Sequence, residues 1–363
     1  MNTKYVLLTV LSITINVIIY YKLCPSVLQL CEVDTCPICF GTDLCNEIGQ
    51  NKIVLQYNTF SAFMYNIFSV KNVYFARFYN MTVVLKKLAH NNEFQKLKEL
   101  KRKDFNELIN FLVSDSGDKH FVLCDKNTAN SFLRIFSYKS SENLETLLHI
   151  NIEPLLLEIF SSQHGWCVPK LYGYCGRLVV VQNAGQPLSE IESFNWFDRS
   201  YVAYQILQSV NNFTKNHDIF RIYLTDISPD NIAVNQDLQI TFIDLENAIL
   251  KKKVAGGEIH YTEHFDEDLY MYSEKQICES SMSDHNIYST CRLLLSKKAP
   301  WPMMKNGLLH NPPDIVKKYF NELFFDIESC VYSSNKINRF KLSDKILKNL
   351  RYILKNYTKF DIL

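Results

Sequence analysis

The sequence lacks a large net charge, internal repeats and low-complexity tracts. Its 39 Lys and Arg residues nearly balance its 38 Asp and Glu residues, which leaves a formal net charge of +1. This balance gives the whole chain no electrostatic attraction toward nucleic acid or an acidic surface. Hydrophobic residues make up 47% of the chain and aromatic residues 13%. This composition excludes global disorder and predicts a large buried core.

The chain also lacks a complete metal-binding motif of the zinc or calcium type. Cys36 and Cys39 have the C-x-x-C spacing of half a zinc site or of a redox pair, but no second C-x-x-C or His pair completes a zinc ribbon. Asp115, Asp118 and Asp125 lack the loop spacing and the terminal Glu of an EF-hand. We therefore favour structural disulfides as the interpretation of the cysteines.

Cysteine itself is plentiful, with 11 residues in the chain. Five of them lie close together near the N-terminus: Cys24, Cys31, Cys36, Cys39 and Cys45. The other six are spread through the rest of the sequence: Cys124, Cys167, Cys175, Cys278, Cys291 and Cys330. The sequence leaves the connectivity open. The odd total leaves one thiol unpaired, unless Cys24 lies in a removed or membrane-proximal segment.

One long apolar run, Tyr5–Tyr21, lies between Lys4 and Lys22. At about 17 residues it is at the lower limit for crossing a bilayer. We interpret residues 1–23 as a signal anchor or signal peptide. We favour a type II membrane anchor, because no small-x-small cleavage site follows the run. A buried core helix is the alternative.

The leader and the cysteines both predict entry into an oxidising compartment. Three N-x-S/T triplets, at Asn80, Asn212 and Asn356, agree with a lumenal glycoprotein. We expect Asn80 to lie in an exposed turn, whereas Asn212 falls within a predicted helix and is a poorer acceptor.

The most informative motif is D-x-x-x-x-N, which runs from Asp226 to Asn231 and is followed by Asp244. Residues 232–234 and 238–243 read as two strands of a hairpin joined by a turn at 235–237. A kinase catalytic loop meets its metal-binding Asp in this way. One carboxylate orients the attacking hydroxyl, while an Asn and a second carboxylate hold the metal on the phosphates. The alternative is a surface Asx turn before a buried strand.

A kinase also needs a strand lysine that contacts the nucleotide phosphates. The sequence that ends at Lys86 fits the V-A-I-K strand pattern, and strand alternation sends Lys87 to the opposite face. The acidic partner of this lysine is predicted on the helix that begins at Glu153. We prefer Glu153 for this role, with Glu158 as the rival, and a solvated helix carboxylate is the alternative.

No glycine-rich phosphate loop precedes Lys86, because residues 68–78 contain no glycine at all. Glycine lets the backbone approach a phosphate closely. A hairpin here would have to cover a nucleotide with side chains or with fewer amide contacts. This absence weighs against an active kinase.

These signals together predict an α+β, bilobal protein-kinase-like fold. We expect a Cys-rich N-terminal segment at 24–59, an N-lobe at 60–185 with a helical insertion from about 90 to 140, and a C-lobe at 186–363. Residues 178–181 predict a buried strand, residues 183–187 a turn suited to the hinge, and residues 196–217 a long amphipathic helix.

The motifs resemble the divergent protein kinase domain proteins of the secretory pathway, in particular the deleted-in-autism-1 branch. The resemblance covers nearly everything after the leader. The segments that carry it are Cys36–Thr42, Lys71–Ala76, Val83–Lys86, Tyr172–Arg177, Asp226–Asn231, Asp244–Asn247, Ser283–Asn286 and Gly307–Pro313. It implies a kinase-like fold, residence in the Golgi or the ER, and secretion as a signalling factor for some members.

The resemblance also implies site roles. Asp226 resembles the catalytic base, Asn231 and Asp244 resemble metal ligands, and Lys86 resembles the phosphate-contacting lysine. Two positions depart from ordinary kinases: Thr225 stands where an Arg would sense an activation-loop phosphate, and Glu246 replaces a Gly. A carboxylate at position 246 would either bind metal or stiffen the loop.

Three functions remain open at this point. The first is a lumenal kinase that uses ATP with Mg²⁺ or Mn²⁺ and acts on a lumenal or extracellular protein or on a sugar, and the same groups are compatible with transfer of AMP instead of phosphate. The second is a pseudokinase that binds a lumenal partner or a receptor. The third is a disulfide-stabilised structural glycoprotein.

Overall fold

A computed structural model describes residues 25–56, 72–87, 97, 105–113, 121–191, 194–264, 270–332 and 338–357. The predicted signal anchor at residues 1–23 lies outside this part of the chain. Within the described residues, no helix is both long enough and apolar enough to span a membrane. The described chain forms two compact units, and each is treated by itself below.

Unit 1 comprises residues up to Lys101 together with Lys139–Glu158 and Lys170–Asn183. It contains one sheet with strand order β1-β2-β3-β6-β5, in which every neighbouring pair is antiparallel. Its strands are β1 (Ile53–Leu55), β2 (Val73–Phe78), β3 (Met81–Lys87), β5 (Leu171–Cys175) and β6 (Leu178–Gln182). Its helices are α2 (Val27–Cys31), α3 (Cys45–Gly49), α8 (Ser141–Ile150) and α9 (Glu153–Ile159), whose last residue falls in unit 2.

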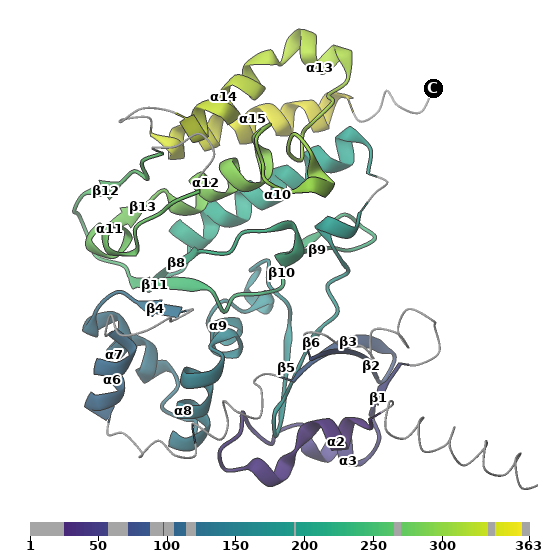
Figure 1. The fold of residues 1–363 in the computed structure, drawn as a ribbon, viewed down its shortest axis with the longest axis vertical. Coiled ribbons are helices and arrows are strands. Elements are labelled where there is room, and N and C mark those ends of the chain that lie inside the picture. Colours follow the sequence, from purple (N-terminus) through teal and green to yellow (C-terminus); the bar gives the residue numbers. More distant parts are fainter. Residues whose placement is uncertain are drawn as a thin grey trace, which may run out of the picture. The chain divides into compact units, whose positions relative to one another are not determined.

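The core of unit 1 lies between its sheet and the two short N-terminal helices. Alternation along β3 sends Val83 and Leu85 to one face, where both are fully buried. Val27 and Leu30 of α2 and Ile48 of α3 belong to the same apolar cluster. Figure 1 shows α2 and α3 lying along this sheet. The Cys-rich segment is therefore an integral part of the unit.

Unit 2 comprises Arg102–Tyr138, Ile159–Pro169 and Ala184–Leu363. Three small sheets have the orders β10-β9-β7, β4-β11-β8 and β12-β13. The strands are β4 (Phe121–Leu123), β7 (Gln186–Pro187), β8 (Phe220–Leu224), β9 (Ile232–Val234), β10 (Ile240–Phe242), β11 (Ala248–Lys252), β12 (Ile259–His260) and β13 (Met282–Ser283). The helices are α6 (Phe105–Val113), α7 (Lys126–Ile135), α10 (Trp196–Lys215), α11 (Glu274–Glu279), α12 (His285–Thr290), α13 (Asp314–Tyr319), α14 (Asn321–Tyr332) and α15 (Arg339–Tyr357).

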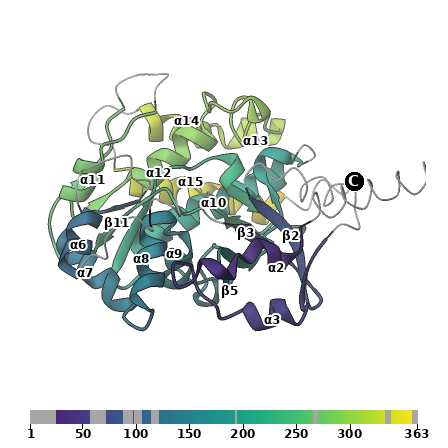
Figure 2. The ribbon, with the colours of Figure 1, turned by 60° about the horizontal axis from the view of Figure 1, so that its bottom comes forward.

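Helix α10 is the central helix of unit 2, and α12 and α15 pack against it, as Figures 1 and 2 show. It begins where Asn195 accepts hydrogen bonds from the amides of Phe197 and Asp198, which satisfies two of the donors that a helix start leaves open. Near its other end, Phe213 stacks on Trp166 with 5.6 Å between ring centroids. The predicted helix at 196–217 is thus present, two residues shorter.

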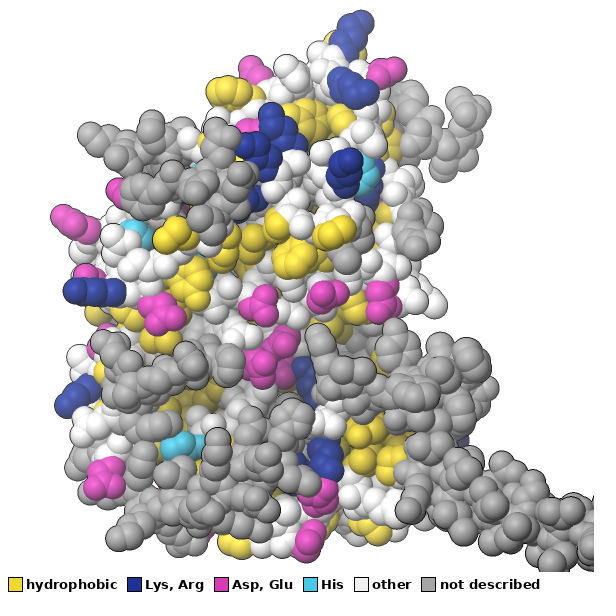
Figure 3. Space-filling model, viewed as in Figure 1, with side chains coloured by type: hydrophobic (Ala, Val, Ile, Leu, Met, Phe, Trp, Pro, Cys, Tyr) yellow, Lys and Arg dark blue, Asp and Glu magenta, His cyan; other side chains and the backbone are white. Residues whose placement is uncertain are grey.

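Charge is distributed unevenly over unit 2 despite the balanced composition. Helix α14 carries acidic side chains and no Lys or Arg, whereas Lys and Arg occur on α13 and α15, and near the top of Figure 3 basic side chains lie beside Asp and Glu. Helix α15 presents several basic side chains to solvent: Lys341, Lys345, Lys348, Arg351 and Lys355. Arg351 donates to the hydroxyl of Tyr204 on α10, so part of this basic surface also fastens the helix to its neighbour.

The expected disulfides are present, and the structure supplies the connectivity that the sequence left open. The pairs are Cys36–Cys39, Cys45–Cys175, Cys124–Cys278 and Cys291–Cys330. Cys31 and Cys167 are reduced, and Cys24 lies outside the described residues. Burial raises the pKa of Cys31 to about 12, which keeps this thiol protonated.

Two segments within the predicted N-lobe, Arg102–Tyr138 and Ile159–Pro169, belong to unit 2. The first of them is part of the insertion after Lys86, which was expected to lengthen the N-lobe. Strand β4 pairs in parallel with β11, and Cys124 is joined to Cys278. A parallel pairing and a disulfide over 154 residues are non-local contacts, which the local sequence pattern does not specify.

Candidate active site

The predicted phosphate-contacting lysine lies in unit 1. The amine of Lys86 on β3 is 2.8 Å from both carboxylate oxygens of Glu153, the first residue of α9. Only 16% of the Lys86 side chain and 3% of the Glu153 side chain are exposed, so the ion pair is largely removed from water. The structure thus brings together the two side chains that the sequence paired, while their contact with a nucleotide stays a prediction.

The local structure explains why Glu153, rather than Glu158, meets the lysine. Asn151 accepts a hydrogen bond of 2.8 Å from the amide of Glu153, which fixes the start of α9. Glu158 has other partners, because its carboxylate accepts a hydrogen bond from Tyr174 and forms an ion pair with Lys139, both at 2.7 Å.

The predicted base and metal ligands lie in unit 2, after strand β8. Asp226 is exposed, whereas the next residue, Ile227, is buried and anchors the loop. Asn231 ends a short 3₁₀ turn, Pro229–Asn231, and its side-chain amide donates to the carbonyl of Asp226 at 3.1 Å. The amide of Asn231 thereby fixes the backbone of the residue predicted to act as the base.

Asp244 reaches the same part of unit 2 through the β9–β10 hairpin. The amide of Ile243 donates to the carbonyl of Asn231 at 3.0 Å, which holds the end of the hairpin beside the loop. Asp244 accepts a hydrogen bond of 3.2 Å from the amide of Glu246. The observed strand β10 covers only Ile240–Phe242, shorter than the predicted 238–243.

These side chains fit a hard divalent cation only in part. Asn231 and Asp244 are partly exposed and offer the oxygen donors that Mg²⁺ and Mn²⁺ prefer. Among the described residues, no group of three or more His, Cys, Asp or Glu side chains is placed to hold a metal by itself. Kinase metals take the rest of their ligands from phosphates and water, so this donor set fits a metal that arrives with a nucleotide.

A buried polar network under the loop was not predicted from the sequence. The Asn286 side chain, fully buried at the start of α12, accepts from the amide of Leu224 at 2.9 Å and donates to the carbonyl of Ile222 at 2.8 Å. His285 faces the Leu224 carbonyl at 3.0 Å through Nε2. Burial lowers the pKa of His285 to about 4, against the opposing effect of that hydrogen bond, so the ring is neutral and donates from Nε2.

Thr225, which occupies the place of the kinase arginine, is also held by an aromatic side chain. Tyr272 forms a side-chain hydrogen bond with Thr225, and burial raises the pKa of the Tyr272 phenol. The Tyr272 ring packs edge-on against His285, with 4.9 Å between centroids. The residue before Asp226 is therefore fixed by neutral groups in the same unit.

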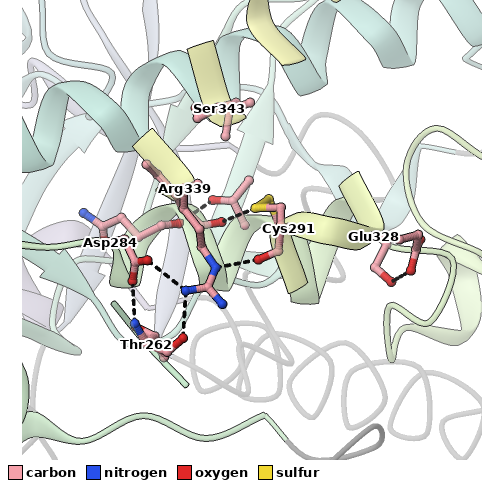
Figure 4. Close-up of a disulfide and its surroundings, with 12 residues drawn as sticks. Thr262, Asp284, Cys291, Glu328, Arg339 and Ser343 are labelled. Atoms are coloured by element: carbon pink, nitrogen blue, oxygen red, sulfur yellow. Dashed lines mark hydrogen bonds and ion pairs between the residues drawn. A yellow bond between two sulfur atoms is a disulfide. The ribbon is translucent and has the colours of Figure 1, made fainter. Parts of the chain in front are cut away.

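The segment between Asp244 and α12 is fastened at several points. Cys278 of α11 is joined to Cys124, and Lys251 of β11 donates to the Cys278 carbonyl. Farther along, Arg339 reaches from α15 to the Asp284 carboxylate and to the Thr262 carbonyl, at 2.8 and 2.7 Å. Figure 4 shows this buried arrangement beside Cys291, which is joined to Cys330.

The connection that would cover nucleotide phosphates in a kinase differs from the usual pattern. In this sheet the connection between β1 and β2 spans residues 56–72. Its sequence contains no glycine, and residues 57–71 lie outside the described part of the chain. The β2–β3 turn at residues 79–80 exposes Asn80, the predicted glycosylation acceptor.

Comparison with known proteins identifies the family of the chain that carries these side chains. Residues 144–332 match the family model described as the protein-kinase domain of FAM69. The chain belongs to this kinase-like family. The fold class expected from the sequence, a mixed α and β kinase-like domain with several disulfides, is thereby confirmed.

Curated relatives extend the similarity beyond the matched domain. Divergent protein kinase domain 2A of Xenopus tropicalis is 28% identical over 382 residues, which cover 90% of this chain and 88% of the relative. The protein of the same name from Homo sapiens is also 28% identical, over 385 residues and with the same coverage. Divergent protein kinase domain 2B of Mus musculus is 25% identical over 203 residues, or 53% of this chain and 44% of the relative. The predicted family resemblance is therefore confirmed.

Proposed function

We propose that this kinase-like protein binds ATP with Mg²⁺ or Mn²⁺ and transfers a phosphoryl group to a hydroxyl acceptor in the secretory pathway. The observation that carries the proposal is the Lys86–Glu153 ion pair. Breaking such a largely buried pair costs several kcal/mol unless another charge replaces the lost partner. An anionic phosphate beside Lys86 is a ligand that this site suits.

The remaining residues have roles that follow from their chemistry. Lys86, held by Glu153, contacts the α- and β-phosphates. Asn231 and Asp244 hold the divalent cation, which supplies positive charge to the phosphates when bound. Asp226 accepts the proton of the acceptor hydroxyl as its oxygen bonds to the γ-phosphorus. The bond between that phosphorus and the β–γ bridging oxygen then breaks, and ADP leaves.

The cysteine pairing supports a lumenal or extracellular location. Four disulfides within the described residues suit an oxidising compartment, since cytosolic thiols are kept reduced. We extend this to residence in the Golgi or ER, either anchored through residues 1–23 or secreted. A lumenal or extracellular protein is the acceptor class that this location favours.

A second function, nucleotide or partner binding without catalysis, is favoured by two specific observations. Residues 56–72 contain no glycine, so a close backbone cradle for the γ-phosphate is lacking in the sequence. Thr225 replaces the arginine that senses an activating phosphate. A pseudokinase that acts as a binding or signalling protein has these features.

The two functions separate in an assay of phosphoryl transfer. The full chain, expressed through the secretory pathway, is incubated with γ-labelled ATP and Mn²⁺, and label on protein and release of phosphate are measured. Asp226→Asn should lower transfer by about 10²- to 10⁴-fold, the usual contribution of a positioned base. Asp237→Asn, an exposed residue in the β9–β10 turn, is the matched control and should change nothing. Equal transfer by wild type and Asp226→Asn would overturn the catalytic proposal.

A further inference from the structure

Strand β3 carries a second ion pair on the face opposite Lys86. The amine of Lys87 lies 2.5 Å from one carboxylate oxygen of Glu32, and the guanidinium of Arg177 lies 2.5 Å from the other. Glu32 directly follows α2, and its backbone is left-handed, with φ 46° and ψ 53°. One carboxylate of the Cys-rich segment therefore joins the lysine strand to the β5–β6 turn.

The backbone around Arg177 fixes this contact further. The Arg177 amide donates to the carbonyl of Cys31 at 2.7 Å, and the Phe40 amide donates to the carbonyl of Gly176 at 2.9 Å. A Cβ atom at Gly176 would lie 2.0 Å from the Cys31 carbonyl oxygen, which no side chain permits. The N-terminal segment thus closes tightly around the turn between β5 and β6.

The same segment also reaches the helix that bears Glu153. Asp43 accepts a hydrogen bond of 3.1 Å from the Tyr174 amide, and the Tyr174 hydroxyl donates to Glu158 of α9 at 2.7 Å. The Cys45–Cys175 disulfide makes the attachment to β5 covalent. Glu158 and Glu153 lie on the same helix, so the segment is connected to both partners of the Lys86 pair.

The charges make Glu32 the critical member of these contacts. Burial raises the pKa of Glu32, but hydrogen bonds from Lys87 and Arg177 outweigh it and lower the pKa, which keeps the carboxylate ionised. Only 2% of the Arg177 side chain is exposed. Without the carboxylate, the buried guanidinium and the Lys87 amine would lose the anion that they share.

We infer that residues 26–45 form a built-in brace that keeps the Lys86–Glu153 pair assembled, and that Glu32 is a positioning residue for Lys86. Glu32 holds the end of β3 through Lys87. Asp43 and Cys45 hold β5, and Tyr174 of β5 in turn holds α9. With these contacts in place, the Lys86–Glu153 pair forms by itself. No partner protein and no modification is needed to move α9 toward Lys86. The predicted effect of Glu32 on nucleotide affinity rests on the proposed function, whereas its predicted effect on the position of Lys86 does not.

The test compares Glu32→Gln with Asp34→Asn in the full chain. Both variants remove one negative charge, but Asp34 is exposed two positions along the same segment. The first measurement is the rate at which a lysine-acylating reagent labels Lys86 without nucleotide, read by mass spectrometry, together with amide hydrogen exchange of α9. Glu32→Gln should raise the Lys86 labelling rate and the exchange of α9, and Asp34→Asn should leave both at the wild-type value.

The second measurement is the affinity for ATP with Mn²⁺. Glu32→Gln should weaken it by about fivefold, the ratio expected for a partly exposed ion pair, and Glu32→Asp should restore part of the loss. If Glu32→Gln does not fold, Lys87→Met removes the strand contact alone and carries the same expectation. Wild-type labelling of Lys86 in both variants would overturn the brace. A wild type that binds no nucleotide would overturn the proposed function, while the labelling result still decides the brace.

Discussion

Lys86 and Glu153 are 67 positions apart in the sequence, yet the lysine amine lies 2.8 Å from each carboxylate oxygen. The lysine stands on an antiparallel strand whose register is fixed on both sides, by Val73 of β2 and Val179 of β6. Strand β3 thus presents its lysine in one orientation, to a helix whose first residue is the matching acid.

Removing the acid should destabilise unit 1 strongly. Glu153→Gln leaves the Lys86 amine with a neutral partner in a poorly hydrated position, and we expect a loss of about 3 kcal/mol in the free energy of unfolding. Glu158→Gln is the control on the same helix, and because Glu158 is more exposed its loss should be smaller. Urea unfolding followed by circular dichroism measures both. Equal losses would contradict the assignment.

The buried amide under the catalytic loop gives a second prediction. Asn286→Asp keeps the acceptor for the Leu224 amide, but it removes the donors to the Ile222 carbonyl and to the Thr214 hydroxyl and buries a charge. We expect a loss of about 3 kcal/mol. Thermal unfolding tests this, with Asn212→Asp on the partly exposed side of α10 as the control. A melting temperature unchanged from wild type would show that the network contributes little.

Two disulfides of unit 2 should differ in their contribution to stability. In the chain-entropy model, Cys124–Cys278 closes a loop of 154 residues and should contribute about 5 kcal/mol, whereas Cys291–Cys330 closes one of 39 and should contribute about 4 kcal/mol. Double serine variants, one for each pair, are compared by urea unfolding. The reverse order would mean that the segment around Cys278 is held mainly by its non-covalent contacts.

Acid should weaken unit 2 through a histidine. Burial lowers the pKa of His285 to about 4 from 6.5, so the unfolded chain takes up a proton at a higher pH than the folded one. The stability that this histidine contributes is present above pH 6.5 and falls as the pH drops from there toward 4. Burial also lowers the pKa values of His217 and His260. His285→Gln should therefore reduce, but not abolish, the slope of melting temperature against pH in this range.

Gly176 offers a test of the packing around the brace. Its φ is +58°, and an added methyl group would meet the Cys31 carbonyl at 2.0 Å, so Gly176→Ala should cost at least about 2 kcal/mol. Gly49 has no heavy atom within 4 Å of an added Cβ, so Gly49→Ala should be neutral or slightly stabilising. Thermal unfolding distinguishes them, and similar melting temperatures would argue against the close approach at Gly176.

The features of the site that are formed by residues close together in the chain could be predicted from the sequence, because they depend on the spacing of those residues. The D-x-x-x-x-N pattern fixes a turn that places Asn231 beside the Asp226 backbone. Alternation along β3 separates Lys86 from Lys87, and the Pro154 signal locates the start of α9. Each of these depends on residues that are neighbours in the chain.

The non-local parts could not be predicted. Nothing near Lys87 indicates that its partner is Glu32, 55 positions earlier and at the end of a five-residue helix. The parallel pairing of β4 with β11, and hence the unit to which Arg102–Tyr138 belongs, also arises from contacts between distant segments. The Ser283–Asn286 sequence carried a family resemblance, but its role under the loop became visible only through the bonds that Asn286 makes.

The central proposal is that Lys86 and Asp244 both serve one nucleotide, and calorimetric titration with a non-hydrolysable ATP analogue and Mn²⁺ tests it most directly. The account predicts one binding site in the wild type, binding at least about tenfold weaker in both Lys86→Met and Asp244→Asn, and unchanged binding in Asp237→Asn. Absence of binding by the wild type, or wild-type affinity in either Lys86→Met or Asp244→Asn, would contradict it.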